Sequence, residues 1–304
     1  MTPWYCDRVF PWAWAGVAAL LVLATFLSYL FHRVRPSPEA AKTLLRVRTW
    51  WVIAGCLFAA MMLGPFGIAG LFCLVSLTAM REFVALDSGM PRRRFVCLIL
   101  AAGTLAHYAA VACSSPESSV GLVATLVAAI IGTCLVVALG SLGRGCIGLA
   151  AFMLGVGGLA CVVGVSRHGP SGAGFRPVFL LLLLTGLNDV AQYLWGKSLG
   201  RRPVVPHISP RKTWAGLVGG VATTSVIAAG IVPFFIAENR LWGLSIGLLI
   251  GLGGFAGDIL ASAYKRRVGA GESGTLLPGH GGVIDRIDSL CLTAPLLYCA
   301  LTFF

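Results

Sequence analysis

Long apolar segments, separated by short charged or Pro/Gly-rich connections, most limit what this chain can fold into. Apolar runs bounded by charge, proline or glycine number about ten, and most approach the roughly 20 residues that a bilayer-spanning helix needs. They cover residues 12–31, 49–64, 66–80, 95–113, 119–139, 145–165, 177–195, 214–235, 241–262 and 289–304. Only 11% of the residues are charged and 58% are hydrophobic, which leaves too little polar surface to cover a soluble domain. The sequence therefore predicts an all-α polytopic integral membrane protein.

Two of these segments, 49–64 and 66–80, are short for a span and meet at Gly64-Pro65, where a kink or a re-entrant turn is an alternative. The distribution of Lys and Arg favours keeping both segments as membrane spans. With about ten spans and the N-terminus outside, most of the 23 Lys and Arg fall on one side. The other side receives Arg8, Arg167, Arg176 and Arg240. Because basic loops stay in the cytoplasm, we expect both termini outside, in the inner (cytoplasmic) membrane of a bacterium.

Small residues within the apolar segments are interpreted as packing residues. Glycine pairs such as Gly216/Gly220 and Gly253/Gly257 let helices approach closely in lipid, and such packing is compatible with a homodimer. The 10 cysteines lie mostly in apolar segments and form no CxxC pair, so we interpret them as small core residues rather than a disulfide framework. The net charge of +12 belongs mainly to one face, where it directs topology and attracts anionic membrane lipid. No aromatic or motif context indicates a nucleic acid partner.

Five of the 11 acids of this acid-poor chain lie within or at the cytoplasmic ends of three late spans: Asp189, Asp258, Glu272, Asp285 and Asp288. A carboxylate within a span is costly unless it is paired or bound to a cation. Pairing with a nearby Lys or Arg is one reading, and a functional role is the one we favour. Asn188 beside Asp189, and Gly257 beside Asp258, are expected to leave room for a ligand.

Basic residues surround these acids in what we predict to be a cytoplasmic cup: Lys197, Arg201, Arg202, Arg211, Lys212, Lys265, Arg266 and Arg267. Mg²⁺ prefers carboxylate and phosphate oxygens, while Lys and Arg hold the remaining phosphate charge. The stretch "SPRKTWAG" adds the hydroxyls of Ser209 and Thr213 just before a helix whose N-terminus favours an anion. A polyphosphate bound with a metal is the predicted ligand.

The segment "PGHGGVIDRIDS" places a glycine-rich turn directly before two acids. The turn alone is typical of any tight connection, and His280 alone fits a plain hydrogen-bonding role. Asp285 and Asp288 are three residues apart, so in a helix they share one face, with Arg286 between them. This combination favours binding of metal and phosphate.

These blocks, in this order, resemble the phosphatidate cytidylyltransferase (CDP-diacylglycerol synthase) family of integral membrane enzymes. The C-terminal signature of that family is matched by Ser262, Lys265, Arg266, Pro278, His280, Gly281, Gly282, Asp285, Arg286 and Asp288. Other blocks are similar at Arg81-Glu82, Asn188-Asp189, Tyr193, Gly196-Lys197, "SPRKTWAG" and Gly257-Asp258. The resemblance covers roughly residues 185–295, and the first half agrees mainly in hydropathy.

The resemblance implies that CTP and phosphatidate, or a related lipid phosphate, give CDP-diacylglycerol and pyrophosphate with the help of Mg²⁺. A second cation is left open. The implied metal ligands are Asp189, Asp258, Asp285 and Asp288. The implied catalytic residues are Asp258, Asp285, Lys265, Arg266 and His280. The implied substrate-binding residues are Asn188, Lys197, Ser209, Lys212, Thr213, Ser262, Gly281, Gly282 and Arg286. The chain then divides into N-terminal helices (1–113), middle helices (114–176) and a catalytic region (177–304).

Some positions depart from the family pattern: Gln192, Ala215, Ala261 and Gly271-Glu272. Such departures fit a divergent paralog with another phospholipid or phosphoalcohol as acceptor, or with reduced activity. Because the core acids are present, we favour an active enzyme. A CTP-dependent enzyme acting on a lipid alcohol is a second reading. A transporter is a third, although the acids cluster at one face and no internal repeat is visible, whereas transporters often place charges at the midplane between repeats.

Overall fold

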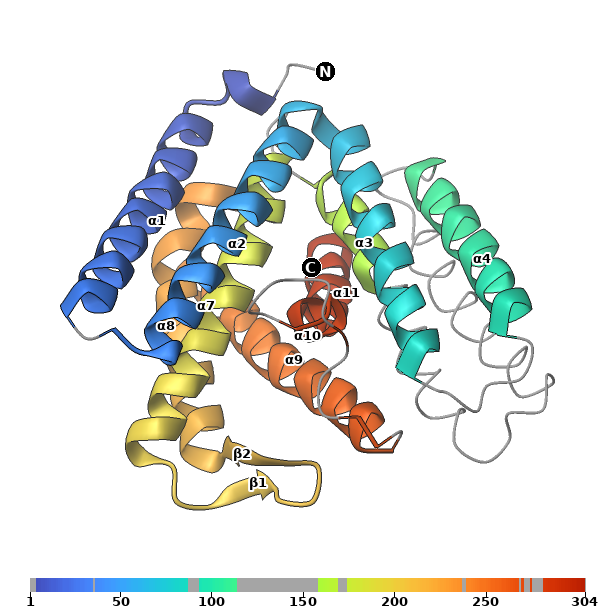
Figure 1. The fold of residues 1–304 in the computed structure, drawn as a ribbon. Coiled ribbons are helices and arrows are strands. Elements are labelled where there is room, and N and C mark those ends of the chain that lie inside the picture. The colour runs from blue at the N-terminus through green and yellow to red at the C-terminus, as the bar shows by residue number, and fades with distance from the viewer. Residues whose placement is uncertain are drawn as a thin grey trace.

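The computed structural model describes residues 4–34, 36–86, 93–113, 158–168, 174–236, 239–267, 269–270, 274 and 281–303. These residues fold almost wholly into helices that form one bundle (Figure 1). The elements are η1 (Trp4–Cys6), α1 (Val9–Val34), α2 (Pro38–Met62), α3 (Gly64–Leu86), α4 (Arg93–Cys113), a helical stretch over 158–165, α7 (Phe175–Leu199), β1 (Pro203–Val205), β2 (Ser209–Thr213), α8 (Trp214–Ile236), α9 (Arg240–Arg267), α10 (Ile284–Ile287) and α11 (Leu290–Phe303). Among the described residues, 7 helices are long and apolar enough to cross a membrane. The prediction of an all-α polytopic membrane protein is confirmed.

The two short predicted segments are full helices. Helix α2 has 25 residues and begins where Ser37 Oγ accepts a hydrogen bond from the Ala40 amide at 3.1 Å, with Pro38 in the first turn. Helix α3 has 23 residues and starts at Gly64, whose φ of 68° reverses the chain in a conformation that glycine adopts without strain. Polar residues before 49 and after 80 lengthen both helices beyond their apolar runs. The two-helix prediction is therefore confirmed, and the re-entrant turn is not formed.

The predicted basic loops meet at one end of the bundle. In Figure 1 the α1–α2 connection, the end of α3, the start of α4, the β1–β2 hairpin and the end of α9 all lie at the bottom, and the α2–α3 turn lies at the top. We call the former the hairpin end. This arrangement agrees with the predicted separation of charge. The spans predicted at 119–139 and over most of 145–165 lie outside the described residues, so the total number of spans and the orientation stay predictions.

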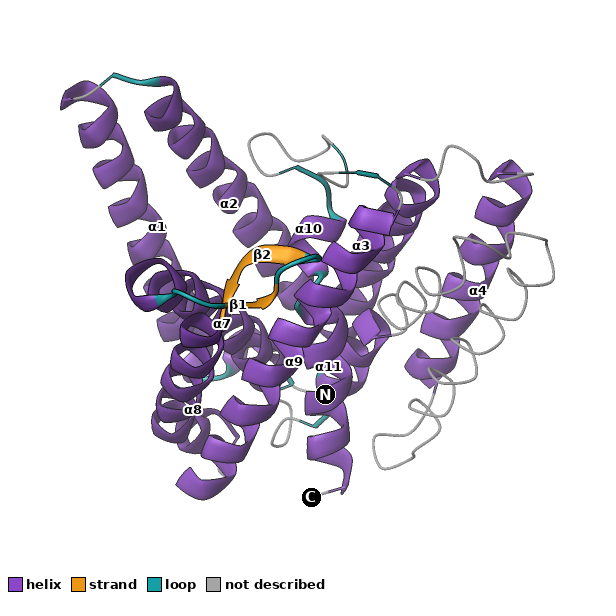
Figure 2. Cartoon of the chain, turned by 90° about the horizontal axis from the view of Figure 1, so that it is seen from below, coloured by secondary structure: helices purple, strands orange, loops and turns teal. Residues whose placement is uncertain are grey.

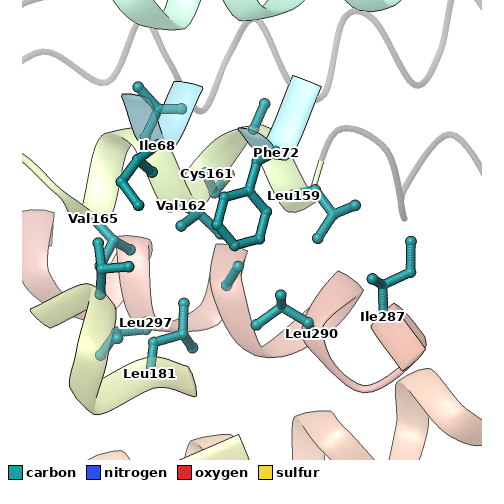
Figure 3. Packing of buried hydrophobic residues seen from close by; sticks show 14 of the residues in the cluster. Ile68, Phe72, Leu159, Cys161, Val162, Val165, Leu181, Ile287, Leu290 and Leu297 are labelled. Carbon is teal, nitrogen blue, oxygen red and sulfur yellow. The ribbon is translucent and has the colours of Figure 1, made fainter. Parts of the chain in front are cut away.

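A hydrophobic core holds the later helices in place. Figure 3 shows Ile68 and Phe72 of α3 above Leu159 and Val162 of the 158–165 stretch, with residues of α7, α10 and α11 below. Helix α8 packs against both α7 and α9, and α9 packs against α11. The cysteines within the described residues form no disulfide, but Cys6, Cys56 and Cys113 are exposed, so the interpretation as core residues is wrong for these three. The acids of α7, α9 and α10 are thus carried on mutually packed helices.

Glycines set the closest of these helix contacts. Gly216 and Gly220 of α8 both lie against Gln192 of α7, and Gly253 lies against Leu296 of α11. A Cβ on Gly257 of α9 would collide with the carbonyl oxygen of Asp288. The predicted close packing is confirmed. The expectation that Gly257 leaves room for a ligand is wrong, because the chain's own backbone fills that space.

A small hairpin, which the sequence did not predict, follows α7. Strands β1 and β2 pair antiparallel with Pro203 opposite Thr213 and Val205 opposite Ser209. Figure 2 shows the hairpin in orange at the end of the helices, where α7 and α9 also reach. The guanidinium Nε of Arg266 on α9 donates to the carbonyl of Ile208 in the hairpin turn at 3.3 Å. The "SPRKT" segment is therefore a strand tied to the end of α9.

Candidate active site

Two lysine–carboxylate pairs form the charged centre of the site. The ammonium group of Lys212 on β2 pairs with Asp258 of α9. The ammonium group of Lys265, two turns later on α9, pairs with Asp285 of α10. All four side chains are at most 28% exposed, so these charges meet with little water between them. Hairpin, α9 and α10 are thereby linked through side chains that the sequence assigned to catalysis or substrate binding.

Asp189 and Asp288 lie beside this centre and receive hydrogen bonds from Ser289. The Ser289 hydroxyl donates to Asp189 Oδ1 at 3.0 Å, and the Ser289 amide donates to Asp288 Oδ1 at 2.9 Å. Asp189, Asp258 and Asp288 are close enough to repel one another electrostatically. Three carboxylates and their neighbouring lysines therefore share one region at the hairpin end.

A cavity of about 220 Å³ opens between α7, β2, α8 and α9. Its lining combines acids, bases and hydroxyls with apolar and aromatic groups: Asp189, Gln192, Tyr193, Ser209, Arg211, Lys212, Thr213, Gly216, Leu217, Phe255 and Asp258. The Lys212 ammonium also lies 5.2 Å from the centre of the Phe255 ring. Pockets for whole small molecules usually span roughly 300 Å³ or more, so this cavity suits the phosphate-bearing part of a ligand.

The amide side chains of α7 hold the helices behind this cavity. Asn188 is fully buried; its Nδ2 donates to Gly251 O at 3.5 Å, and its Oδ1 accepts from Thr224 at 3.4 Å. Gln192 Nε2 also donates to Gly251 O, at 3.4 Å, but Gln192 lines the cavity. Asn188, which the sequence assigned to substrate binding, therefore contacts α8 and α9 and is not part of the described lining.

Four other predicted residues line the cavity or position Asp285. Ser209 and Thr213 line the cavity, and Thr213 Oγ1 accepts the Gly216 amide at 3.2 Å, which caps the start of α8. Gly281 has a φ of 82°, and the Gly282 amide donates to Asp285 Oδ2 at 3.4 Å, so the glycine turn positions Asp285.

Four more predicted residues, which do not line the cavity, lie on the helices around the lysine–carboxylate pairs. Lys197 is exposed, 5.8 Å from the Tyr193 ring centre, and Ser262 is half-buried on α9. Arg266 ties the hairpin to α9, and Arg286 is exposed on α10. His280 lies outside the described residues.

The structure also brings to the site residues outside the implied catalytic, substrate-binding and metal sets, among them Arg211, which the sequence placed in the basic cup, and Glu82. Arg211 lines the cavity. Glu82 of α3 accepts a hydrogen bond from the Ile284 amide at 3.1 Å, at the start of α10, although the two are far apart in sequence. The Arg81-Glu82 pair resembles a block of the family, so the sequence indicated that Glu82 matters. The sequence did not indicate that Glu82 contacts α10. Glu82 therefore fixes the segment that carries Asp285 and Asp288.

The chemistry of the clustered carboxylates fits a hard divalent cation, because such cations prefer oxygen ligands. A bound cation would also offset the repulsion between the carboxylates. Within the described part of the chain, however, no three His, Cys, Asp or Glu side chains are arranged to hold a metal ion. Asp258 and Asp285 instead face lysine ammonium groups. The magnesium site thus stays a prediction from residue chemistry.

The fold and site together define an integral membrane protein with a charged cavity at one end of a helical bundle. Comparison with known proteins gives the family. The sequence profile described as "Cytidylyltransferase family" matches residues 44–304, so the chain belongs to the cytidylyltransferase family.

Individual relatives refine this picture. The chain is 37% identical to the "Uncharacterized protein YnbB" of Escherichia coli (strain K12), over 93% of this chain and 95% of that protein. It is 41% identical over 127 residues to a phosphatidate cytidylyltransferase of Brucella suis biovar 1, covering 41% of this chain and 46% of that enzyme. A phosphatidate cytidylyltransferase of Staphylococcus aureus (strain COL) is 36% identical over 125 residues, 41% of this chain and 48% of that enzyme. The similarity to these named enzymes thus spans less than half of either chain.

Proposed function

We propose that this protein transfers the cytidylyl group of CTP to phosphatidate, giving CDP-diacylglycerol and pyrophosphate in phospholipid biosynthesis. The observation that carries the proposal is the cavity in which Lys212, Arg211 and Ser209 of the hairpin meet Asp258 and Asp189 of two helices. It combines groups that bind phosphate with carboxylates that favour a cation. The partial similarity to two phosphatidate cytidylyltransferases supports phosphatidate as the acceptor.

In the proposed reaction, a phosphate oxygen of the lipid attacks the α-phosphorus of CTP. The new P–O bond forms as the bond to the bridging oxygen of the β-phosphate breaks, and pyrophosphate leaves with that oxygen. The nucleophile is already an anion, so no general base is assigned. The main task of the protein is to position two negatively charged substrates and to offset their charge.

The described residues divide this task between two sides. Lys212 and Arg211 reach the cavity from the hairpin, where they would neutralise phosphate oxygens, with hydrogen bonds from Ser209 and Thr213. Lys265 stands beside Asp285 and is placed to exchange that partner for a phosphate. Tyr193 and Leu217, also in the lining, are suited to the apolar part of a lipid acceptor.

The carboxylates Asp189, Asp258, Asp285 and Asp288 are the proposed magnesium ligands. When bound, Mg²⁺ would supply neutralisation of the charge that develops on the transferred phosphate and the leaving group. Release of Asp258 and Asp285 from Lys212 and Lys265 would free both the acids and the bases for this purpose. Whether a second cation joins them is a further question for metal titration.

Two other functions compete with this proposal. A CTP-dependent kinase would use the same charged cavity with a lipid alcohol, and the departures at Gln192 and Ala261 leave room for another lipid phosphate. Gln192 lines the cavity next to Asp189, so it is placed to affect the choice of acceptor. A transporter is disfavoured because the described acids of α7, α9 and α10 gather in one region that the hairpin reaches through Lys212.

The test uses purified full-length protein, Mg²⁺ and CTP labelled separately on the α- or γ-phosphate, with a panel of lipid phosphates and lipid alcohols. The proposal predicts that α-label enters a CDP-lipid made from phosphatidate while pyrophosphate is released. Entry of γ-label into a lipid would identify a kinase. Preference for another lipid phosphate would correct the acceptor, and absence of turnover with the whole panel would contradict an enzymatic role.

A further inference from the structure

A second cavity lies between α1 and α2, away from the candidate active site. Its volume is about 460 Å³, and it is lined by Val22, Thr25, Phe26, Tyr29, Leu44, Val47, Arg48 and Trp51. On each helix these positions follow the spacing i, i+3, i+4, i+7, so each set forms one helical face. We call this cavity the α1–α2 groove. Its walls are mostly apolar, with a single guanidinium among them.

The groove is open because α1 is held to the bundle by its first half. Phe10 packs at 5.0 Å from Phe175, and Trp14 packs at 5.1 Å from Phe58, measured between ring centres. Further along, Trp51 Nε1 donates to Thr25 Oγ1 at 3.0 Å and bridges the helices. Beyond these contacts Val22 and Phe26 stay 57% and 60% exposed. Figure 1 shows α1 at the edge of the bundle beside α2.

Arg48 indicates what occupies the groove. The structure gives its guanidinium no hydrogen bond or ion pair among the described residues, although it lines an apolar groove. Arg48 is exposed beside these apolar walls, so its charge is available to attract an anion. Lys42 and Arg46 precede Arg48 on α2, and Trp50 and Trp51 follow it, which is the order expected at a membrane interface. Phosphate groups of anionic lipids are concentrated at that depth.

We propose that the α1–α2 groove binds one anionic phospholipid, with its phosphate at Arg48 and an acyl chain along Val22, Phe26 and Trp51. A phospholipid supplies both the anion and the apolar chain that these walls require. The site does not share a lining residue with the active-site cavity. Helix α1 also precedes the part of the chain, residues 44–304, that the family profile matches, so this site is built partly from outside it.

The test is native mass spectrometry of the full-length protein, reconstituted with phosphatidylglycerol or phosphatidylcholine and then released into mild detergent. Wild type is expected to keep one phosphatidylglycerol, about fivefold more often than phosphatidylcholine, since one interfacial basic residue contributes about 1 kcal/mol. Arg48→Gln should remove that preference. The matched control is Arg94→Gln, which changes an exposed arginine of α4 at the same end of the bundle and should change nothing.

A second pair of variants tests the groove itself. Val22→Trp fills the groove and should lower the retained phosphatidylglycerol, whereas Leu20→Trp, on the opposite face of α1, should not. Equal retention by wild type and Arg48→Gln, or by Val22→Trp and Leu20→Trp, would overturn the proposal. A dimer that dissociates in Val22→Trp would also overturn the proposal, because a second copy of the chain would then occupy the groove. Lipid retention is measured without CTP, so this test stands apart from that of the proposed reaction.

Discussion

At the scale of single residues, the site depends on which lysine meets which carboxylate. The sequence placed Lys212, Lys265, Asp258 and Asp285 in one region, and the structure brings them together in two ion pairs. The pairing itself was not predictable, because Lys212 reaches α9 only through a hairpin whose sequence reads as a basic loop. Each pair lies where water is scarce, so the loss of one partner leaves the other charge poorly solvated.

Replacement of Lys212 by methionine tests this arrangement. Lys212→Met removes the partner of Asp258 and a positive charge from the cavity, so cytidylyl transfer should fall by about tenfold or more. Lys212→Arg keeps the charge and should retain more activity than Lys212→Met. Steady-state rates over a range of CTP concentrations measure both effects. Equal rates in wild type and Lys212→Met would show that this ammonium group takes no part.

Polarity in the sequence did not reveal the direction in which a side chain points. Asn188 and Asp189 are neighbours on α7, yet Asn188 is buried among α8 and α9 while Asp189 lines the cavity. Glu82 reaches the start of α10 from α3, and nothing in the spacing of the late motifs indicates that contact. Motif order thus predicted that several of these side chains lie together, whereas their supporting contacts depend on helix rotation and packing.

At the scale of elements, close packing between α9 and the segment from α10 to α11 fixes the acids. The apolar runs predicted most of the described helices. The start of α2 and the end of α3 lie in polar sequence, so the apolar runs alone did not locate them. The hairpin was missed because its strands are short, with three and five residues. Gly257 shows how tightly these elements meet, since its missing side chain allows the Asp288 carbonyl to reach α9.

Substitution of that glycine tests the contact. Gly257→Ala should force α9 away from Asp288, lower stability by about 1–3 kcal/mol and reduce turnover. The matched control is Gly230→Ala in α8, where nothing lies within 4 Å of the new Cβ. That change should leave the melting temperature in detergent equal or slightly higher, as expected for a better helix former. A Gly257→Ala protein that melts and reacts like wild type would contradict the packing argument.

At the scale of the whole molecule, the arrangement separates charge between the two ends of the bundle. The hairpin end carries the basic connections and the proposed active site, whereas Asp7 and Arg176 pair near the other end, with Arg176 Nε donating to Asp7 Oδ2 at 3.0 Å. Sequence alone predicted this separation from the positions of Lys and Arg. It also predicts an even number of spans, which depends partly on residues 114–157.

Reporter fusions test that topology in a bacterial host. Alkaline phosphatase fused after Phe304 should be active, because we expect the C-terminus outside, and green fluorescent protein at the same position should stay dark. Green fluorescent protein inserted between Val205 and Ser209 of the hairpin should fluoresce. The opposite pattern at both positions would invert the predicted orientation. Agreement at one position alone would change the number of spans between them.

The central claim is that the carboxylates at the hairpin end support cytidylyl transfer, and Asp285→Asn tests it most directly. The measurement is pyrophosphate release from CTP in the presence of phosphatidate, by wild type, Asp285→Asn and the control Asp7→Asn, which loses a comparable ion pair at the other end. We predict that Asp285→Asn inserts into the membrane normally but loses at least about 100-fold in rate, while Asp7→Asn stays close to wild type. A wild-type rate in Asp285→Asn would contradict the account.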